Sequence, residues 1–152
     1  MGQVSPPPPA PDRAQFDRAM RRFLVEMAER MDLPAGAAEA LANRSPIRGS
    51  SGFLCRLEIA RHTRAAIRPE ILLPISMRDL EGRDIRHLLV LHEALAAELR
   101  WRVGLSTDGI LQLMAMDWIE DPRDAVFALD LGQLLGRDAL RELQGKVGGS
   151  SS

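Results

Sequence analysis

The sequence predicts an α+β fold built on an antiparallel sheet, and the spacing of apolar residues is the main reason. In three long segments apolar residues recur every three or four positions, as on one face of a helix. In several short segments between them they recur at every second position, as in a strand with one buried face. The predicted order is α-(α)-β-β-β-α-β-β-α, where the bracketed helix is short. Strands grouped between helices in this way are typical of the α+β class.

The bulk composition is that of an ordinary globular domain. The chain has 152 residues, of which 45% are hydrophobic and 27% charged, so we expect a single domain over residues 12–144. A net charge of −1 provides no global field that favours nucleic acid or an anionic membrane surface. The single cysteine, Cys55, suits a reducing compartment, and no apolar run approaches the 18 residues of a membrane span. We therefore expect a cytoplasmic protein that does not insert into membranes.

The first part of the chain predicts a tail and two helices. Residues 1–11 contain the run Pro6–Pro9 and are expected to be disordered; a ligand for an SH3-type domain is the alternative interpretation. Asp12 is a plausible N-cap for a helix that reaches Met31, and residues 34–44 predict a short Ala-rich helix. The apolar stripe of the long helix consists of Phe16, Met20, Phe23, Leu24, Met27 and Met31.

Three strands are predicted next. Residues 53–60 alternate, with Phe53, Cys55, Leu57 and Ile59 on one face. A second, weak strand is expected over residues 63–68 and a third over residues 71–77, with Pro69 between them. Pro74 predicts that the third strand lies at an edge or carries a bulge, because proline cannot donate to a ladder.

A helix over residues 84–99 and a hairpin follow. The helix carries Leu88, Leu91, Leu95 and Leu99, and its apolar face is widened by Ile85, Leu89, Val90 and Ala96. This face is broader than a helix with one buried side needs, so we expect part of it to meet a second subunit. The hairpin joins Trp101, Val103 and Leu105 to a return strand over residues 110–119 through Thr107-Asp108-Gly109.

The last helix has a clear start signal in Asp121-Pro122-Arg123-Asp124 and is expected to run to Leu143. Gly145 is predicted to end it, and residues 145–152 are predicted to be a flexible tail. The residues expected to face inward are Val126, Phe127, Leu131, Leu134, Leu135 and Leu140.

No pattern of reactive side chains predicts an enzyme, a metal site or a cofactor. His87 and His92 are five residues apart, about 140° around a helix, so they cannot chelate a metal from one face. Cys55 falls on the apolar face of a strand, where a buried and unreactive thiol is expected. The acidic pairs Glu81/Asp84 and Glu120/Asp121 lie at helix starts, where capping explains them, and Gly132 and Gly136 indicate close packing of the last helix on the sheet.

A basic patch on the first helix also has an ordinary explanation. Nucleic-acid binding depends on several cations that no neighbouring acid opposes, and acidic residues balance these overall. A solvated helix face is the favoured interpretation, and no nucleic-acid partner is expected. The patch comprises Arg13, Arg18, Arg21 and Arg22.

Residues 88–143 resemble a known family. The run opens with Leu88-Leu89, continues through the strand Arg102-Val103-Gly104-Leu105 and the turn Asp108-Gly109, and closes with Leu111-x-Leu113 before the final helix. In this order of elements the chain resembles the class I type III secretion chaperones, the Tir-chaperone-like family. His92 stands where that family often has Asn. The resemblance implies a twisted antiparallel sheet packed by three main helices.

The resemblance also implies a function that involves no catalysis. Such chaperones are homodimers that bind the N-terminal segment of a secreted effector in extended form and keep it competent for secretion; the secretion-system ATPase is a further candidate partner. The implied dimer interface comprises His92, Leu95, Leu99, Trp101 and Val103. The implied effector-binding residues are Phe16, Met20, Phe23, Leu24, Met27, Leu54, Met114 and Met116. The alternatives are an adaptor or regulator of the same fold that escorts no exported substrate, and a small enzyme or ligand-binding protein.

Overall fold

The computed structural model describes residues 13–60 and 64–148 and confirms the α+β class and the predicted order of helices and strands. The elements are α1 (Arg13–Arg30), α2 (Ala35–Ala42), β1 (Ile47–Arg48), β2 (Leu54–Ile59), β3 (Ile67–Ser76), the 3₁₀ turn η1 (Met77–Asp79), α3 (Gly82–Glu98), β4 (Trp101–Leu105), β5 (Ile110–Ala115) and α4 (Pro122–Gly148). The predicted N-terminal tail and the Asp12 cap lie outside the described residues.

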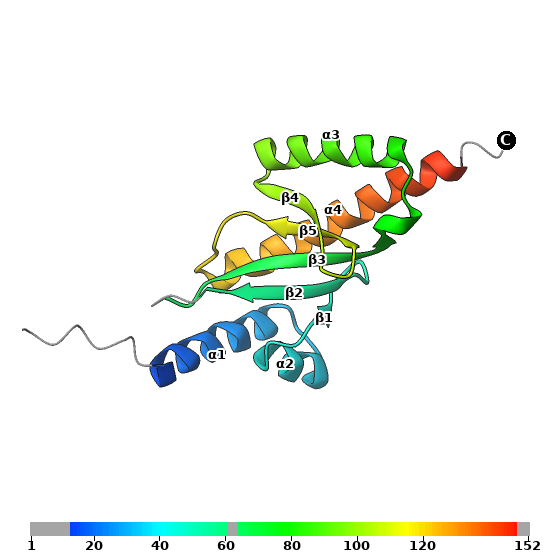
Figure 1. Cartoon of the computed structure of the whole chain (residues 1–152). Helices are drawn as coiled ribbons and strands as arrows, with labels where there is room; N and C mark the ends of the chain where they lie inside the picture. Colours follow the sequence, from blue (N-terminus) through cyan, green and yellow to red (C-terminus); the bar gives the residue numbers. More distant parts are fainter. Residues whose placement is uncertain (1–12, 61–63, 149–152) are drawn as a thin grey trace, which may run out of the picture.

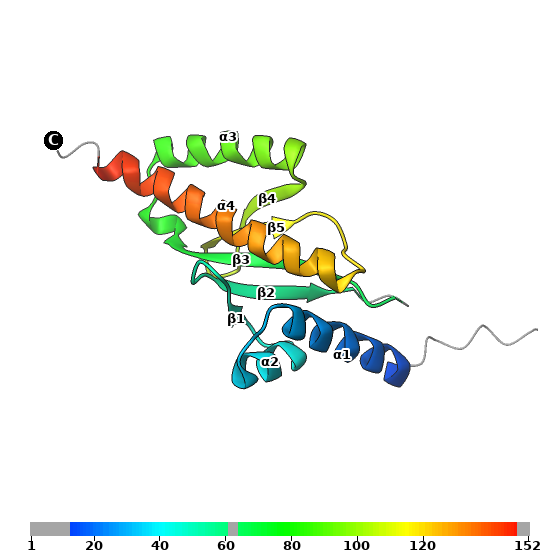
Figure 2. The same cartoon turned by 180° about the vertical axis from the view of Figure 1, so that it is seen from behind.

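The five strands form one antiparallel sheet in the order β1-β2-β3-β5-β4. Helix α4 crosses one face of this sheet, behind it in Figure 1 and in front of it in Figure 2. Helices α1 and α2 lie by the β1 edge, whereas α3 lies beyond the opposite edge, along β4 (Figure 1). The opposite face of the sheet has no helix in front of it in Figure 1.

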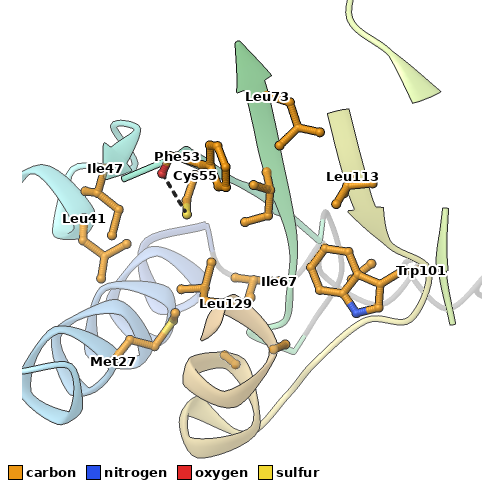
Figure 3. Close-up of a cluster of buried hydrophobic side chains, with 14 of the residues drawn as sticks. Met27, Leu41, Ile47, Phe53, Cys55, Ile67, Leu73, Trp101, Leu113 and Leu129 are labelled. Atoms are coloured by element: carbon orange, nitrogen blue, oxygen red, sulfur yellow. Dashed lines mark hydrogen bonds between the residues drawn. The ribbon is translucent and has the colours of Figure 1, made fainter. Parts of the chain in front are cut away.

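The core lies between the sheet and helices α1 and α4. Alternate residues of the two central strands point into it, so Ile71 and Leu113 have no exposed surface. Figure 3 shows these strands contributing Ile67, Leu73 and Leu113, with Met27 approaching from α1 and Leu129 from α4. Burial of each such side chain stabilises the fold by about 1.5–3 kcal/mol. None of the helices in the described ranges is long and apolar enough to cross a membrane.

The prediction of separate strands over residues 63–68 and 71–77 was wrong, because β3 is one strand from Ile67 to Ser76. Pro69 is tolerated because it falls between the isolated bridge Ile67↔Ile119 and the ladder with β5, which begins at Glu70↔Met114. Pro74 lies where the β3–β5 register shifts, between Leu72 and Ser76, which confirms the predicted bulge. The first strand of the sheet, β1, was not predicted, and residues 61–63 lie outside the description.

The turn and capping signals are confirmed. Gly109 has φ of 77°, the left-handed geometry that the hairpin turn requires. The Asp121 carboxylate accepts the backbone N–H of Arg123 at 2.8 Å, and the Asp84 carboxylate accepts that of Glu81 at 3.0 Å. Strand β5 ends at Ala115, four residues before the predicted end at Ile119.

The prediction for the inward face of helix α4 is only partly correct, since Val126, Leu131, Leu135 and Leu140 are half-buried against the core. Phe127 is 71% exposed and Leu134 is 45% exposed, so the prediction that they face inward was wrong. The fully buried residues of the helix are mostly small and comprise Ala125, Ala128, Leu129, Gly132, Gln133, Gly136, Ala139 and Leu143. The helix also continues to Gly148, past the predicted end at Gly145.

The two glycines explain this orientation and confirm the predicted close packing. A Cβ atom on Gly132 would lie 2.6 Å from Cη2 of Trp101 and 2.7 Å from Cγ1 of Ile71. A Cβ atom on Gly136 would lie 2.9 Å from Cδ2 of Leu73. The large side chains of β3 and β4 therefore fill the space that side chains of α4 would otherwise occupy.

Candidate protein-binding surfaces

The outer edge of β4 is held to α3 by a histidine. Arg102 and Gly104 face β5 in the ladder, so the N–H of Val103, which lies between them, points to the free edge of the sheet. There it donates to Nδ1 of His92 at 3.0 Å. Because Nδ1 accepts this hydrogen bond, the proton of the neutral imidazole is on Nε2.

An apolar pocket of about 220 Å³ opens beside this histidine. His92 contributes the only ionisable side chain to the lining, which is otherwise hydrocarbon, thioether and backbone. Leu89, which is 60% exposed, and Leu105, which is 46% exposed, bring their apolar side chains to the surface here. The full lining is Met77, Ile85, Leu88, Leu89, His92, Val103, Gly104, Leu105 and Leu111.

The structure separates the five residues implied as a dimer interface. His92 and Val103 meet at the β4 edge, and Leu99 is 42% exposed at the C-terminal end of α3. Leu95 and Trp101 are buried in the core, so they lie beneath the exposed residues of α3 and β4 and are not themselves exposed. Leu89 and Leu105 belong to the surface but were not among the five. The breadth of the apolar stripe on residues 84–99 was the signal that could have identified Leu89.

The stripe of α1 does not form an open groove. Met20, Phe23, Leu24 and Met27, all implied as effector-binding, are buried in the core, and Phe16 is half-buried against it. The physical reason is that α1 packs against α4, which closes the apolar side of the helix. In this structure these four side chains are therefore not available to a partner.

The other three implied effector-binding residues are partly exposed. Leu54 and Met114 are on the sheet face opposite α4. The residues next to them along the strands, Cys55 and Leu113, point into the core, and successive side chains of a strand alternate between the two faces. The Met114 side chain lies over Gly104. A Cβ atom added to Gly104 would come within 2.5 Å of the Met114 methyl group. Met116 is half-buried just beyond the end of β5.

Charged side chains surround these apolar residues on the open face. Arg56 donates to Glu70 at 3.0 Å, and Arg68 binds both carboxylate oxygens of Glu58. The Arg68 guanidinium also lies 4.1 Å from the ring centre of Trp118. The cations Arg56 and Arg68 of this face are thus paired with acids of neighbouring strands, whereas Arg102 donates to the sulfur of Met114.

The side chains considered as reactive or metal-binding groups have contacts that explain them as parts of the fold. Cys55 is buried, and burial raises the pKa of its thiol to about 11 although a hydrogen bond from Gln133 opposes that shift. His87 contacts Glu142 of α4 at 2.6 Å, whereas His92 accepts the N–H of Val103 in β4. Within residues 13–60 and 64–148, no three His, Cys, Asp or Glu side chains gather where they could hold a metal ion.

Comparisons of the chain with protein-family models, with curated proteins and with solved structures found no match.

Proposed function

We propose that this chain is a homodimeric chaperone of the class I type III secretion kind, which binds the N-terminal segment of a secreted effector in extended form. The observation that carries the proposal is the apolar surface formed by Leu89, Leu99, Leu105 and the pocket beside His92, which we call the α3/β4 surface. His92, Leu99 and Val103, which are at or beside this surface, are among the five residues for which the resemblance implies a two-fold interface. The α+β fold with its antiparallel sheet is also the fold that the resemblance implies.

The α3/β4 surface supports self-association on physical grounds. Exposed leucines around an apolar concavity leave hydrocarbon in water, and covering them with a partner surface is favourable by about 25 cal/mol per Å² buried. A two-fold axis uses one patch twice, so a single surface of this kind is sufficient for a closed dimer.

The open sheet face supports binding of an extended segment. Leu54 and Met114 provide apolar contacts there, and charged pairs such as Arg56 and Glu70 surround them. Methionine fits such a role because its flexible thioether can repack around different side chains. An extended chain can satisfy both features, with alternate side chains on the apolar positions and polar groups between them.

Two measurements test the proposal. Light scattering is expected to show a dimer, and a pull-down from the native host at physiological salt is expected to retain a secreted protein bound through its N-terminal segment. Met114→Glu is expected to reduce that capture while the dimer persists. A strict monomer that retains no such protein would contradict the proposal, and a partner held through a folded domain would favour an adaptor instead.

A further inference from the structure

We infer that the exposed face of α1 binds an acidic segment of a partner protein. The binding groups are the guanidinium groups of the basic patch, which comprises Arg13, Arg18, Arg21 and Arg22. The inference goes beyond the proposed function and does not depend on a homodimer, because α1 lies by the β1 edge of the sheet and α3 lies beyond the opposite edge (Figure 1).

The arginines of the basic patch have no carboxylate to pair with in the described part of the chain. Two acids of α1 are paired with other cations, since Asp17 accepts Arg44 at 3.1 Å and Glu26 accepts Arg30 at 3.2 Å. Glu29, the remaining acid of the helix, is almost two turns beyond the patch. The acids that balance the patch in the sequence therefore do not balance it in space.

This local imbalance makes the patch a strong attractor for anions. Its four arginines contribute a charge of +4, so the rest of the chain carries −5 (−1 − 4 = −5). A concentrated charge on one face draws a partner of opposite sign to that face and orients it. In Figures 1 and 2, α1 lies beside α2 at the lower boundary of the molecule, and all four arginines are exposed.

An apolar contact beside the patch favours a protein as the partner. Val25 is 37% exposed and lies one turn after Arg21 and Arg22, so the three side chains share one face of the helix. A protein segment that carries an apolar side chain next to its acids matches both the charge and the exposed valine.

The two other common anionic partners match this face less well. A helix binds a lipid surface through an exposed apolar side, and the apolar side of α1 is buried in the core. Single-stranded nucleic acids stack their bases on exposed aromatic rings. The two aromatic residues of α1 do not provide such a ring, since Phe16 is half-buried and Phe23 is buried.

The geometry of the patch suits carboxylates on a short segment. Each planar guanidinium group can donate two parallel hydrogen bonds to one carboxylate. Arg18 and Arg22 are one helical turn apart, so they present two such groups side by side. Arg13 and Val25 are about 18 Å apart along the helix axis, so about six residues of an extended segment or about twelve of a helical one cover the face.

Binding of a synthetic peptide tests the inference. The probe is a fluorescein-labelled peptide of about twelve residues that contains Glu and a Leu, and the control peptide has Gln in place of every Glu. Fluorescence anisotropy with the full chain is expected to show that the acidic peptide binds about tenfold more tightly than the control peptide or better. This binding should weaken several-fold as NaCl is raised from about 50 to about 300 mM, because salt screens exposed charges.

Two double substitutions locate the binding site. Arg18→Glu with Arg22→Glu is expected to weaken binding of the acidic peptide by about tenfold or more, because attraction becomes repulsion. Arg137→Glu with Arg141→Glu on α4 is the matched control, since these two arginines are also exposed and one turn apart. The control is expected to leave the affinity within about twofold. Arg18→Gln with Arg22→Gln removes the charges without reversing them, and an unchanged thermal unfolding curve shows that each variant is folded.

The outcomes are distinct from those of the proposed function. Tight binding of the acidic peptide that is lost in the α1 variants and kept in the α4 variant supports the inference. No preference for the acidic peptide, or equal effects of the α1 and α4 variants, overturns it. Tighter binding to a single-stranded oligonucleotide or to vesicles that contain phosphatidylglycerol, in the same buffer, overturns the assignment to a protein segment. A strict monomer would contradict the homodimer and leave peptide binding unchanged.

Discussion

At the scale of single residues, Gln133 of α4 connects the helix to the hairpin that begins the sheet. Its Oε1 accepts the N–H groups of Ser51 and Phe53 at 3.0 and 3.2 Å. Its Nε2 donates to the Phe53 carbonyl at 3.0 Å. The side chain thus pairs with the backbone of Phe53 much as a neighbouring strand would, in a site that excludes water.

Replacing this amide should destabilise the fold. Gln133→Leu leaves the N–H groups of Ser51 and Phe53 without the oxygen that accepts them, whereas the Phe53 carbonyl keeps the N–H of Gly49. We expect the free energy of unfolding to fall by about 2–4 kcal/mol. Chemical denaturation measures the loss. Gln112→Leu is the matched control, because Gln112 is also buried but its side-chain amide bonds to the side chains of Arg56 and Met114. A loss for Gln133→Leu no larger than that of the control would contradict this account.

At the scale of elements, the closeness of α4 to the sheet depends on the absence of a side chain at Gly132. Gly132→Ala should lower the free energy of unfolding by about 1–3 kcal/mol, because the clash with Trp101 and Ile71 exceeds the gain in helix propensity of about 1 kcal/mol. Gly36→Ala in α2 is the control, since an added Cβ meets nothing within 4 Å there and should stabilise the fold slightly. Equal effects of the two changes in urea melts would refute the clash.

The orientation of α4 is also testable by substitution. Phe127→Ser should change the free energy of unfolding by less than about 1 kcal/mol, because Phe127 is largely exposed. Leu129→Ala, two residues away on the buried face, should cost about 2–5 kcal/mol. Thermal denaturation compares the two variants. A large loss for Phe127→Ser with a small one for Leu129→Ala would mean that the helix is rotated.

The same elements show which parts of the fold the sequence could predict. The hairpin turn at Gly109 and the caps at Asp84 and Asp121 were predictable because each depends on a few adjacent residues. The continuity of β3 through Pro69 was not, since it depends on where the ladder with β5 begins. The burial of Phe127 and Leu134 was mistaken because it depends on how closely α4 approaches the sheet, where the space beside Trp101 and Ile71 admits only glycine.

The candidate site likewise combines features that adjacent residues determine with features that depend on packing between distant elements. His92 was selected through the family resemblance, which depends on a local run of leucines, a strand and a turn. The exposure of Leu89 and Leu105 could not, because it depends on how α3 lies along β4. The burial of the α1 stripe depends on packing against α4, which is distant in the sequence.

At the scale of the whole molecule, stability in alkali should depend largely on one thiol. The pKa of Cys55 rises from 9.0 to about 11 through burial, so between these values the unfolded chain loses a proton that the folded chain keeps. Stability is therefore fully present below pH about 9 and falls as the pH rises toward about 11. The chain has no tyrosine and Lys146 is its one lysine, so few other side chains titrate in this range.

Urea melts at a series of pH values between 8 and 11 would measure this dependence. The Cys55→Ala variant is the control and should show a flatter profile, whatever its stability at neutral pH. Identical slopes for the two proteins would show that the thiol does not couple to folding.

The contact between α1 and α4 has a consequence for how the protein is made in the cell. Met20, Leu24 and Met27 of α1 share a buried cluster with Ala125 and Leu129 of α4. During synthesis, which adds about 5–20 residues per second, the first helix therefore emerges from the ribosome well before the last one. Its methionines and leucine remain uncovered for several seconds, so the nascent chain itself presents an apolar segment to the holding factors of the cell.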